Sequence, residues 1–187
     1  LLFDKTILRE KRPYGKCNPP MRSRENVDAL WEYVFDGTID TLGSDHGPYA
    51  DEEKVKHGNF FKEYSGFGGY DAMLAGMLTE GVHKRGLPLE RLAALTSGNP
   101  ARVMGLAPRK GSLLPGTDAD IAVVDLDAEW VFDGTKSLSK TKSSHIIYHG
   151  SHLKGKVEQT WVRGELIYDH GTIKAARGYG RFVAKQK

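Results

Sequence analysis

The stretch TIDTLGSDHGP, residues 38–48, decides how this chain is interpreted. Its first half has the β-branched and apolar residues of a short strand, and its second half places polar residues where that strand would end. Gly47 and Pro48 then break the pattern. The stretch therefore predicts a strand that leads into a functional loop, with Asp45 and His46 at the junction.

Helical and extended patterns alternate on both sides of this stretch. Residues 13–22 combine a short possible strand with a Pro-Pro pair, which forces an extended backbone. Apolar residues at helical spacing predict an amphipathic helix over about 24–36. Residues 49–69 are a long polar connection with several glycines, and connections of this length often cover a site. Further helices are predicted from about residue 70, at 89–97 and at 99–105.

Beyond residue 105 the pattern becomes mainly β. Residues 120–126, DIAVVDL, predict a buried strand. Strand-like runs follow at 156–163 and 165–168, joined at Gly164. The chain therefore changes from mixed α and β in its first half to mostly β in its second.

Composition indicates a soluble globular protein. Of the 187 residues, 39% are hydrophobic and 27% are charged, and the net charge of +3 is scattered along the chain. No apolar run is long enough to span a bilayer and the first residues lack the layout of a signal peptide, so a cytoplasmic location without membrane attachment is expected. Only residues 174–187 are locally basic, and a solvated terminus explains them better than nucleic-acid binding does. The single Cys17 excludes an internal disulfide framework and a cysteine-based zinc site, and a small buried side chain is its expected role.

Four segments carry a family resemblance: 16–22 (KCNPPMR), 43–48 (GSDHGP), 99–102 (NPAR) and 111–120 (GSLLPGTDAD). In this order they resemble the last two barrel strands with their loops, the closing helix, and the start of the small β-sandwich in the cyclic amidohydrolases. This group contains allantoinase, hydantoinase, dihydropyrimidinase and dihydroorotase.

The resemblance implies an α/β fold, the C-terminal portion of a TIM-type (β/α)8 barrel followed by part of a small β-sandwich domain. Residues 1–105 would supply strands seven and eight with their helices, 106–170 the sandwich part, and 171–187 a C-terminal tail. A whole barrel needs ~250 residues, and the chain opens without a methionine, so a fragment is expected. The N-terminal half of the barrel would come from the same or another polypeptide. A dimer or tetramer is expected, as is common in the family.

The resemblance also implies the chemistry of Asp45. In this family a His-x-His pair, a carboxylated lysine and two further histidines hold a divalent metal centre, expected here to be two Zn(II), and those ligands lie outside this sequence. Asp45 would complete the centre, take the proton from the metal-bound hydroxide that attacks a cyclic amide, and deliver it to the leaving nitrogen. A simpler role for Asp45 is to cap the following turn. His46 either supports the Asp45 carboxylate or is only packed.

The resemblance places substrate recognition on the main chain of Asn18, Ser65 and Gly66. The motifs look most like allantoinase, followed by hydantoinase or dihydropyrimidinase, all of which open a cyclic ureide. Tyr49 stands where dihydroorotases usually have histidine, which counts against that enzyme. A non-catalytic scaffold related to dihydropyrimidinase, and an independent interaction domain from residue 106 onward, remain alternatives.

The run from His145 to His152 contains three histidines, with His149 between them. No acidic residue or cysteine joins them, so surface histidines in a polar loop are predicted in preference to a metal site.

Overall fold

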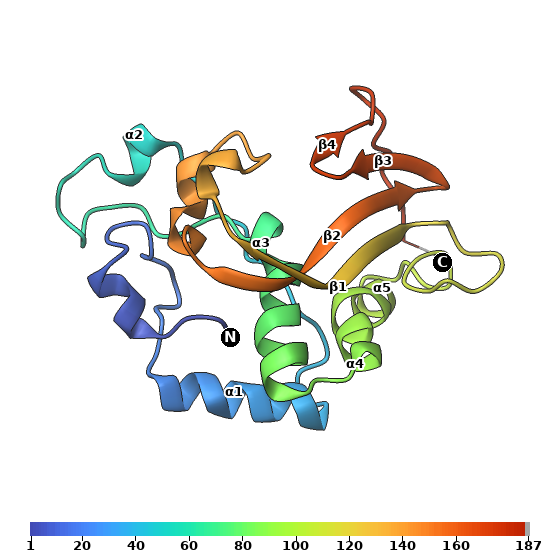
Figure 1. The fold of residues 1–187 in the computed structure, drawn as a ribbon, viewed down its shortest axis with the longest axis horizontal. Helices are drawn as coiled ribbons and strands as arrows, with labels where there is room; N and C mark the ends of the chain where they lie inside the picture. Colours follow the sequence, from blue (N-terminus) through green and yellow to red (C-terminus); the bar gives the residue numbers. More distant parts are fainter. Residues whose placement is uncertain (186–187) are drawn as a thin grey trace.

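The computed structural model describes residues 1–185, with helices in the first half of the chain and a sheet in the second (Figure 1). No helix within these residues is long and apolar enough to cross a membrane. The helices are α1 (Arg24–Asp36), α2 (Asp51–Lys54), α3 (Tyr70–Met77), α4 (Leu89–Ala93) and α5 (Asn99–Val103), with the shorter or wider turns η1 (Lys5–Arg9), η2 (Leu78–His83), η3 (Ala94–Gly98), η4 (Gly134–Lys136) and η5 (Lys142–Tyr148).

Four strands form one antiparallel sheet in the order β1-β2-β3-β4. Their bounds are β1 (Ile121–Val131), β2 (His152–Val162), β3 (Glu165–Asp169) and β4 (Thr172–Ile173). The register pairs Val162 with Glu165, so Arg163 and Gly164 form a two-residue hairpin turn. Both have positive φ, 51° and 79°, as the turn that matches the twist of a hairpin requires. The predicted strands at 156–163 and 165–168 are confirmed.

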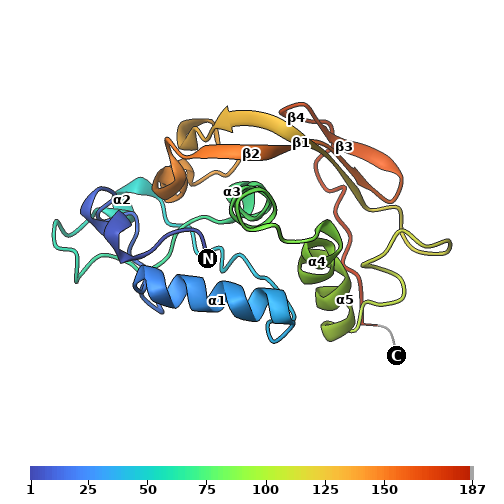
Figure 2. The ribbon, with the colours of Figure 1, turned by 60° about the horizontal axis from the view of Figure 1, so that its bottom comes forward.

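The sheet covers one side of the helices and α1 lies on the opposite side of α3 (Figure 2). One buried cluster joins α1, the α3–η2 helix and the α4–η3 helix, and β1 packs its Val124 and Leu126 against it. A second cluster joins Ala72 of α3 to Phe132 and Tyr148 from the second half of the chain. The two halves therefore share their hydrophobic cores.

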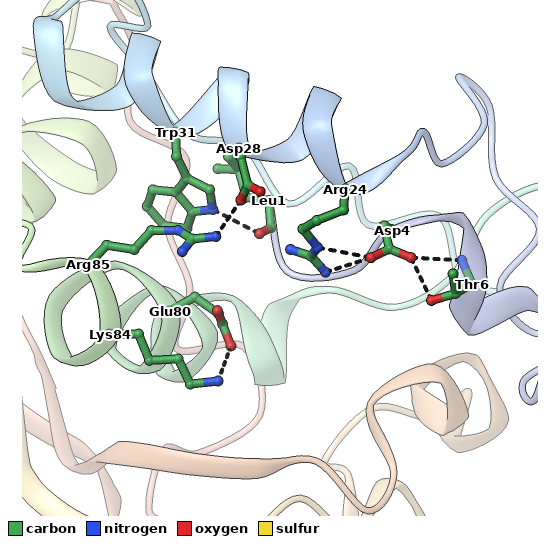
Figure 3. Close-up of polar contacts among 9 residues, drawn as sticks. All are labelled: Leu1, Asp4, Thr6, Arg24, Asp28, Trp31, Glu80, Lys84 and Arg85. Atoms are coloured by element: carbon green, nitrogen blue, oxygen red, sulfur yellow. Dashed lines mark hydrogen bonds and ion pairs between the residues drawn. The ribbon is translucent and has the colours of Figure 1, made fainter.

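Polar contacts fix the start of the chain to α1, and further contacts join α1 to Arg85, just after η2 (Figure 3). The indole N–H of Trp31 donates to the carbonyl of Leu1 at 3.0 Å. The Arg85 guanidinium lies 5.2 Å from the centre of the Trp31 ring and pairs with Asp28 at 2.8 Å. These contacts hold the first residues beside the apolar cluster that α1 forms.

The helix predicted over 24–36 is confirmed at both ends, because Ser23 precedes it in extended conformation and Gly37 ends it at φ 95°. The strands predicted within 13–22 and 38–48 are wrong for the residues that the structure describes. Residues 13–15 form a turn, residues 39–48 have no regular secondary structure, and no neighbouring strand forms a ladder with either segment. Their main chain bonds to helix ends and loops instead, as where the N–H of Leu42 donates to the carbonyl of Leu95 at 3.0 Å.

The strand predicted over 120–126 forms, but the prediction that it is buried is wrong. Ile121 is 37% exposed and Val123 is 44% exposed. β1 is an edge strand of the sheet, and along residues 1–185 no second sheet covers its outer face. The sandwich part of the expected fold therefore stays a prediction.

Gly155 is the point at which β2 crosses the helices. Its φ is 94°, and a Cβ there would lie 2.8 and 2.9 Å from atoms of the Leu78 side chain. We expect Gly155→Ala to lower the free energy of unfolding by about 1–3 kcal/mol more than Gly171→Ala does, because only the first variant overpacks a contact. Gly171 has a similar φ of 89° with open space around it. Equilibrium urea unfolding of both variants measures the difference, and equal losses would show that the Leu78 contact is not what demands glycine.

Candidate functional site

Asp45 lies directly after segment 38–44, which has no regular secondary structure beyond a bend at its start. It is exposed and adopts a φ of 45°, a left-handed conformation that aspartate tolerates better than most residues. Its carboxylate forms no hydrogen bond or ion pair with other described residues. A turn-capping carboxylate would accept a main-chain N–H. The geometry therefore favours a carboxylate that is open to a ligand.

His46 is fastened to the start of α3. Its Nδ1 accepts a hydrogen bond from the N–H of Gly69 at 3.0 Å, and its ring stacks on Tyr70 with centroids 4.1 Å apart. Neither contact involves the Asp45 carboxylate. These contacts favour packing over direct support of Asp45, the two roles that the sequence left open.

His145 lies behind His46, with ring centroids 5.9 Å apart, and it is completely buried. Its Nδ1 lies 3.5 Å from the hydroxyl of Ser137, which itself donates to the carboxylate of Asp71. The prediction of a surface histidine is wrong here because η5 turns this segment inward, where its next residues join the second apolar cluster. His149 and His152 are exposed, as predicted.

The His145 ring also explains why residue 68, in the 49–69 connection, is a glycine. A Cβ on Gly68 would lie 2.3 Å from the His145 ring.

Burial lowers the pKa of His145 below 6.5, and the Asp71 charge opposes this effect. Its Nε2 is buried without a hydrogen-bond partner among the described residues. His145 is therefore held as a neutral ring at neutral pH.

The predicted substrate-binding segments meet beside Asp45. The N–H of Gly66 donates to the carbonyl of Lys16 at 2.9 Å, which places Ser65 near the chain that leads to Asn18. A Cβ on Gly66 would lie 2.5 Å from the carbonyl oxygen of Gly47, so this approach requires glycine. Segments 16–18, 45–47 and 65–66 thus converge, although they are far apart in sequence.

The main-chain groups in this region differ in their availability. Both the N–H and the carbonyl of Gly66 are engaged within the chain, by Lys16 and Lys54. In residues 1–185, no hydrogen bond engages the main chain of Asn18, which is exposed, or of Ser65, which is half-buried. Asn18 and Ser65 are therefore better placed than Gly66 to bind a ligand through the main chain.

Lys54 is a residue of this region that the sequence did not reveal. Its side chain is completely buried, and its Nζ donates to the carbonyls of Lys16 at 3.2 Å, Tyr64 at 3.0 Å and Gly66. Burial lowers its pKa from 10.5 to about 8. A lysine among acidic residues in a polar loop resembles a solvated side chain, so no local pattern indicates this role.

The rest of the 49–69 connection is held by a second lysine and a glutamate. Nζ of Lys16 donates to the carbonyls of Phe61, at 2.9 Å, and Glu63. The Glu63 side chain is buried and accepts the N–H of His57 at 2.9 Å. The connection is therefore an organised structure.

Cys17 is half-buried beside Lys54, and burial raises the pKa of its thiol, as expected of a packed group rather than a nucleophile.

The chain offers a metal ion one donor in this region. Among residues 1–185 there is no group of three or more histidine, cysteine, aspartate or glutamate side chains that could hold a metal ion. The open oxygen donor of Asp45 fits one ligand position, whereas zinc sites usually have three or four protein ligands. A complete centre needs further ligands from outside these residues.

Comparison with known proteins connects most of the chain with one family. The Amidohydrolase family matches residues 5–167. The chain is 38% identical to L-hydantoinase of Paenarthrobacter aurescens over 93% of its length and 38% of the relative's. It is also 38% identical to an allantoinase of Rubrobacter xylanophilus, over 92% of the chain and 37% of that protein. A dihydroorotase of Elusimicrobium minutum is 39% identical over 85% of the chain and 35% of that protein.

The fold has a solved counterpart. The structure of L-hydantoinase (dihydropyrimidinase) from Arthrobacter aurescens superimposes with a TM-score of 0.88 and 36% identity, over 96% of this chain and 40% of that one. The chain thus spans about two fifths of the length of the proteins it matches. This match supports the expectation of a partial barrel, although the described strands are all antiparallel.

His145 makes stability depend on pH in a defined direction. Because its folded-state pKa lies below 6.5, the unfolded chain binds a proton that the folded chain resists as pH falls below 6.5. The free energy of unfolding should therefore decrease as the pH is lowered below 6.5, by at most about 1.4 kcal/mol per pH unit from this group. We expect His145→Gln to flatten the slope measured by denaturant unfolding between pH 7 and 5. The matched change at exposed His152 should keep it, and an unchanged slope in His145→Gln would contradict the assignment.

Proposed function

We propose, from the premise that this chain belongs to the Amidohydrolase family, that it forms the C-terminal part of an enzyme that hydrolyses a cyclic amide. The observation that carries the proposal is the convergence of three segments on an open carboxylate. Asp45 has no partner among the described residues, while the segments of Asn18 and Ser65 are fixed beside it. Relatives named allantoinase, hydantoinase and dihydroorotase support this class of reaction.

In the proposed mechanism Asp45 has two tasks, as a metal ligand and as the group that moves the proton. A divalent centre, proposed to be two Zn(II), supplies when bound a water whose pKa is lowered toward ~7. The oxygen of the attacking water forms a bond to the ring carbonyl carbon, and Asp45 takes the proton that this water loses. The C–N bond of the ring then breaks, and Asp45 returns the proton to the leaving nitrogen. The product is one open-chain molecule that carries both the new carboxylate and the released amide or ureide nitrogen.

The main chain of Asn18 and Ser65 would orient the ring. Their free N–H and carbonyl groups match the alternating carbonyl and N–H groups of a cyclic ureide such as a hydantoin, allantoin or dihydropyrimidine. Main-chain recognition also explains how asparagine can stand at position 18, since the contact does not use the side chain. We therefore favour an allantoinase-like or hydantoinase-like substrate.

Two alternatives rest on specific observations. The dihydroorotase relative is as similar in sequence as the hydantoinase and allantoinase relatives, so overall similarity does not separate these enzymes, and Tyr49 is a single residue that counts against a dihydroorotase. The Tyr49 ring stacks on Tyr64 with centroids 4.9 Å apart, which gives it a packing role. A non-catalytic scaffold is the other alternative, and the open Asp45 carboxylate favours the enzyme over it.

The enzyme would be completed by further chain. We infer that the N-terminal half of the barrel, from the same or another polypeptide, supplies the remaining metal ligands, and that the assembled protein is a cytoplasmic homo-oligomer. The edge strand β1 supports an additional protein surface against this chain, because it leaves Ile121 and Val123 partly exposed. A cavity of about 1000 Å³ lies between β1 and the helices α4 and α5, bordered mainly by apolar side chains such as Leu89.

Removal of the Asp45 carboxylate tests the mechanism. In the enzyme that contains this chain, Asp45→Asn should lower kcat/KM for hydantoin, allantoin or dihydrouracil by about 10²–10⁴-fold, because no group then accepts and returns the proton. Asp40→Asn is the matched control, since Asp40 is an exposed aspartate earlier in the same segment. Activity of Asp45→Asn within about threefold of the control would refute the assigned role.

Composition of the purified material tests the assembly. We expect plasma mass spectrometry to find two equivalents of zinc or a similar metal per active site, together with polypeptide that completes a barrel of ~250 residues in the intact-mass spectrum. Dialysis against a chelator should abolish activity, and metal should restore it. A complete barrel without metal would favour the scaffold alternative.

A further inference from the structure

We propose that Lys54 is a positioning residue for the substrate: its buried ammonium group holds the chain that leads to Asn18 in a fixed relation to Ser65 and Gly66. This inference rests on the proposed function, because it assigns a role at the same site. It concerns a residue that contacts neither the proposed metal ligand nor the ring. Its effect on binding would pass through the main chain that it fixes.

The hydrogen bonds of Lys54 join two separate segments. One acceptor is the carbonyl of Lys16, 38 positions away in sequence, and the other two are the carbonyls of Tyr64 and Gly66, 10 and 12 positions away. The Tyr64 and Gly66 acceptors flank Ser65 directly. The Lys16 acceptor lies two residues before Asn18. One side chain therefore sets both sides of the region where the ring would bind.

The acceptors indicate that Lys54 acts through its donors. All three are neutral main-chain carbonyls, and a protonated lysine has three N–H groups to match them. The charged or titratable groups that face Lys54 are Lys16 and Cys17 from one segment and Glu63 from the other, with the Tyr49 ring 5.9 Å from Nζ. None of them forms an ion pair with Lys54. The buried Lys54 ammonium group therefore serves as a hydrogen-bond donor to these three carbonyls rather than as a partner in an ion pair.

The position of Lys54 separates this role from general stability. Lys54 is a member of neither of the two apolar clusters. Its loss should therefore loosen segments 16–18 and 64–66 while α1 and α3 stay folded. The carbonyl of Lys16 also accepts the N–H of Gly66, so the exchange rate of that amide reports the same junction.

Lys54→Met tests the proposal, because methionine has a similar length and no N–H donor. We expect the amide hydrogen of Gly66 to exchange at least about tenfold faster, with unchanged exchange in α3. In the enzyme that contains this chain, KM for the ring that the wild type hydrolyses should rise about tenfold or more, with kcat changed less than about threefold. Lys56→Met is the matched control, since Lys56 is an exposed lysine two residues away.

Other outcomes separate the two proposals. If the wild type hydrolyses no cyclic amide, the proposed function fails and so does the substrate role of Lys54, whereas faster Gly66 exchange would still establish the junction. Unchanged exchange, or faster exchange with unchanged KM, would overturn the positioning role alone. If Lys54→Met does not fold, Lys54→Gln, which keeps two N–H donors, is measured in the same way. Failure of both variants to fold would also overturn it, because a positioning residue leaves the helices intact.

Discussion

The structure around Asp45 depends on how main-chain carbonyls are satisfied where no β-ladder exists. Buried carbonyls need donors, and segments 13–22 and 38–48 have no neighbouring strand among the described residues to provide them. Cationic side chains supply donors to the carbonyls of Lys16 and Ile39 in these segments, and to carbonyls of the neighbouring connection and of α1. Lys54 and Lys16 together serve five carbonyls, and Arg91 serves those of Val34 and Ile39 at 2.9 and 2.6 Å.

This arrangement makes the 49–69 connection part of the site. Lys54 and Lys16 tie it to the segment that precedes Asn18, and Glu63 ties it internally. Behind it, His145 of the β half packs against Gly68 and approaches His46. The second half of the chain therefore supports the first from behind the site, and an independent interaction domain from residue 106 onward becomes less attractive. Such a domain would expose Phe132 and Tyr148, which share a cluster with Ala72.

The sequence predicted the elements whose formation is decided locally. The α1 helix carries its apolar spacing and its terminal glycine in its own residues, and the β2–β3 hairpin carries its turn at Arg163 and Gly164. The local pattern predicted only a functional loop at Asp45, and the role proposed for its carboxylate came from the family resemblance. Segments 13–22 and 38–48 failed as strands because a ladder requires a partner, which no local pattern provides. Lys54 and His145 were missed for a related reason, since their burial is imposed by residues distant in sequence.

The electrostatic contrast at the centre of the site follows from these same contacts. The carbonyls of Lys16, Tyr64 and Gly66 accept hydrogen bonds from Lys54, and His46 accepts one from the N–H of Gly69. Asp45 combines a charged side chain with no partner among the described residues. A group whose surroundings are already satisfied does not need to break existing bonds when it binds a ligand, and such preorganisation is what makes fixed polar groups effective in catalysis. The same contacts that replace a β-ladder therefore leave one carboxylate unsatisfied, at the point where the reaction would require it.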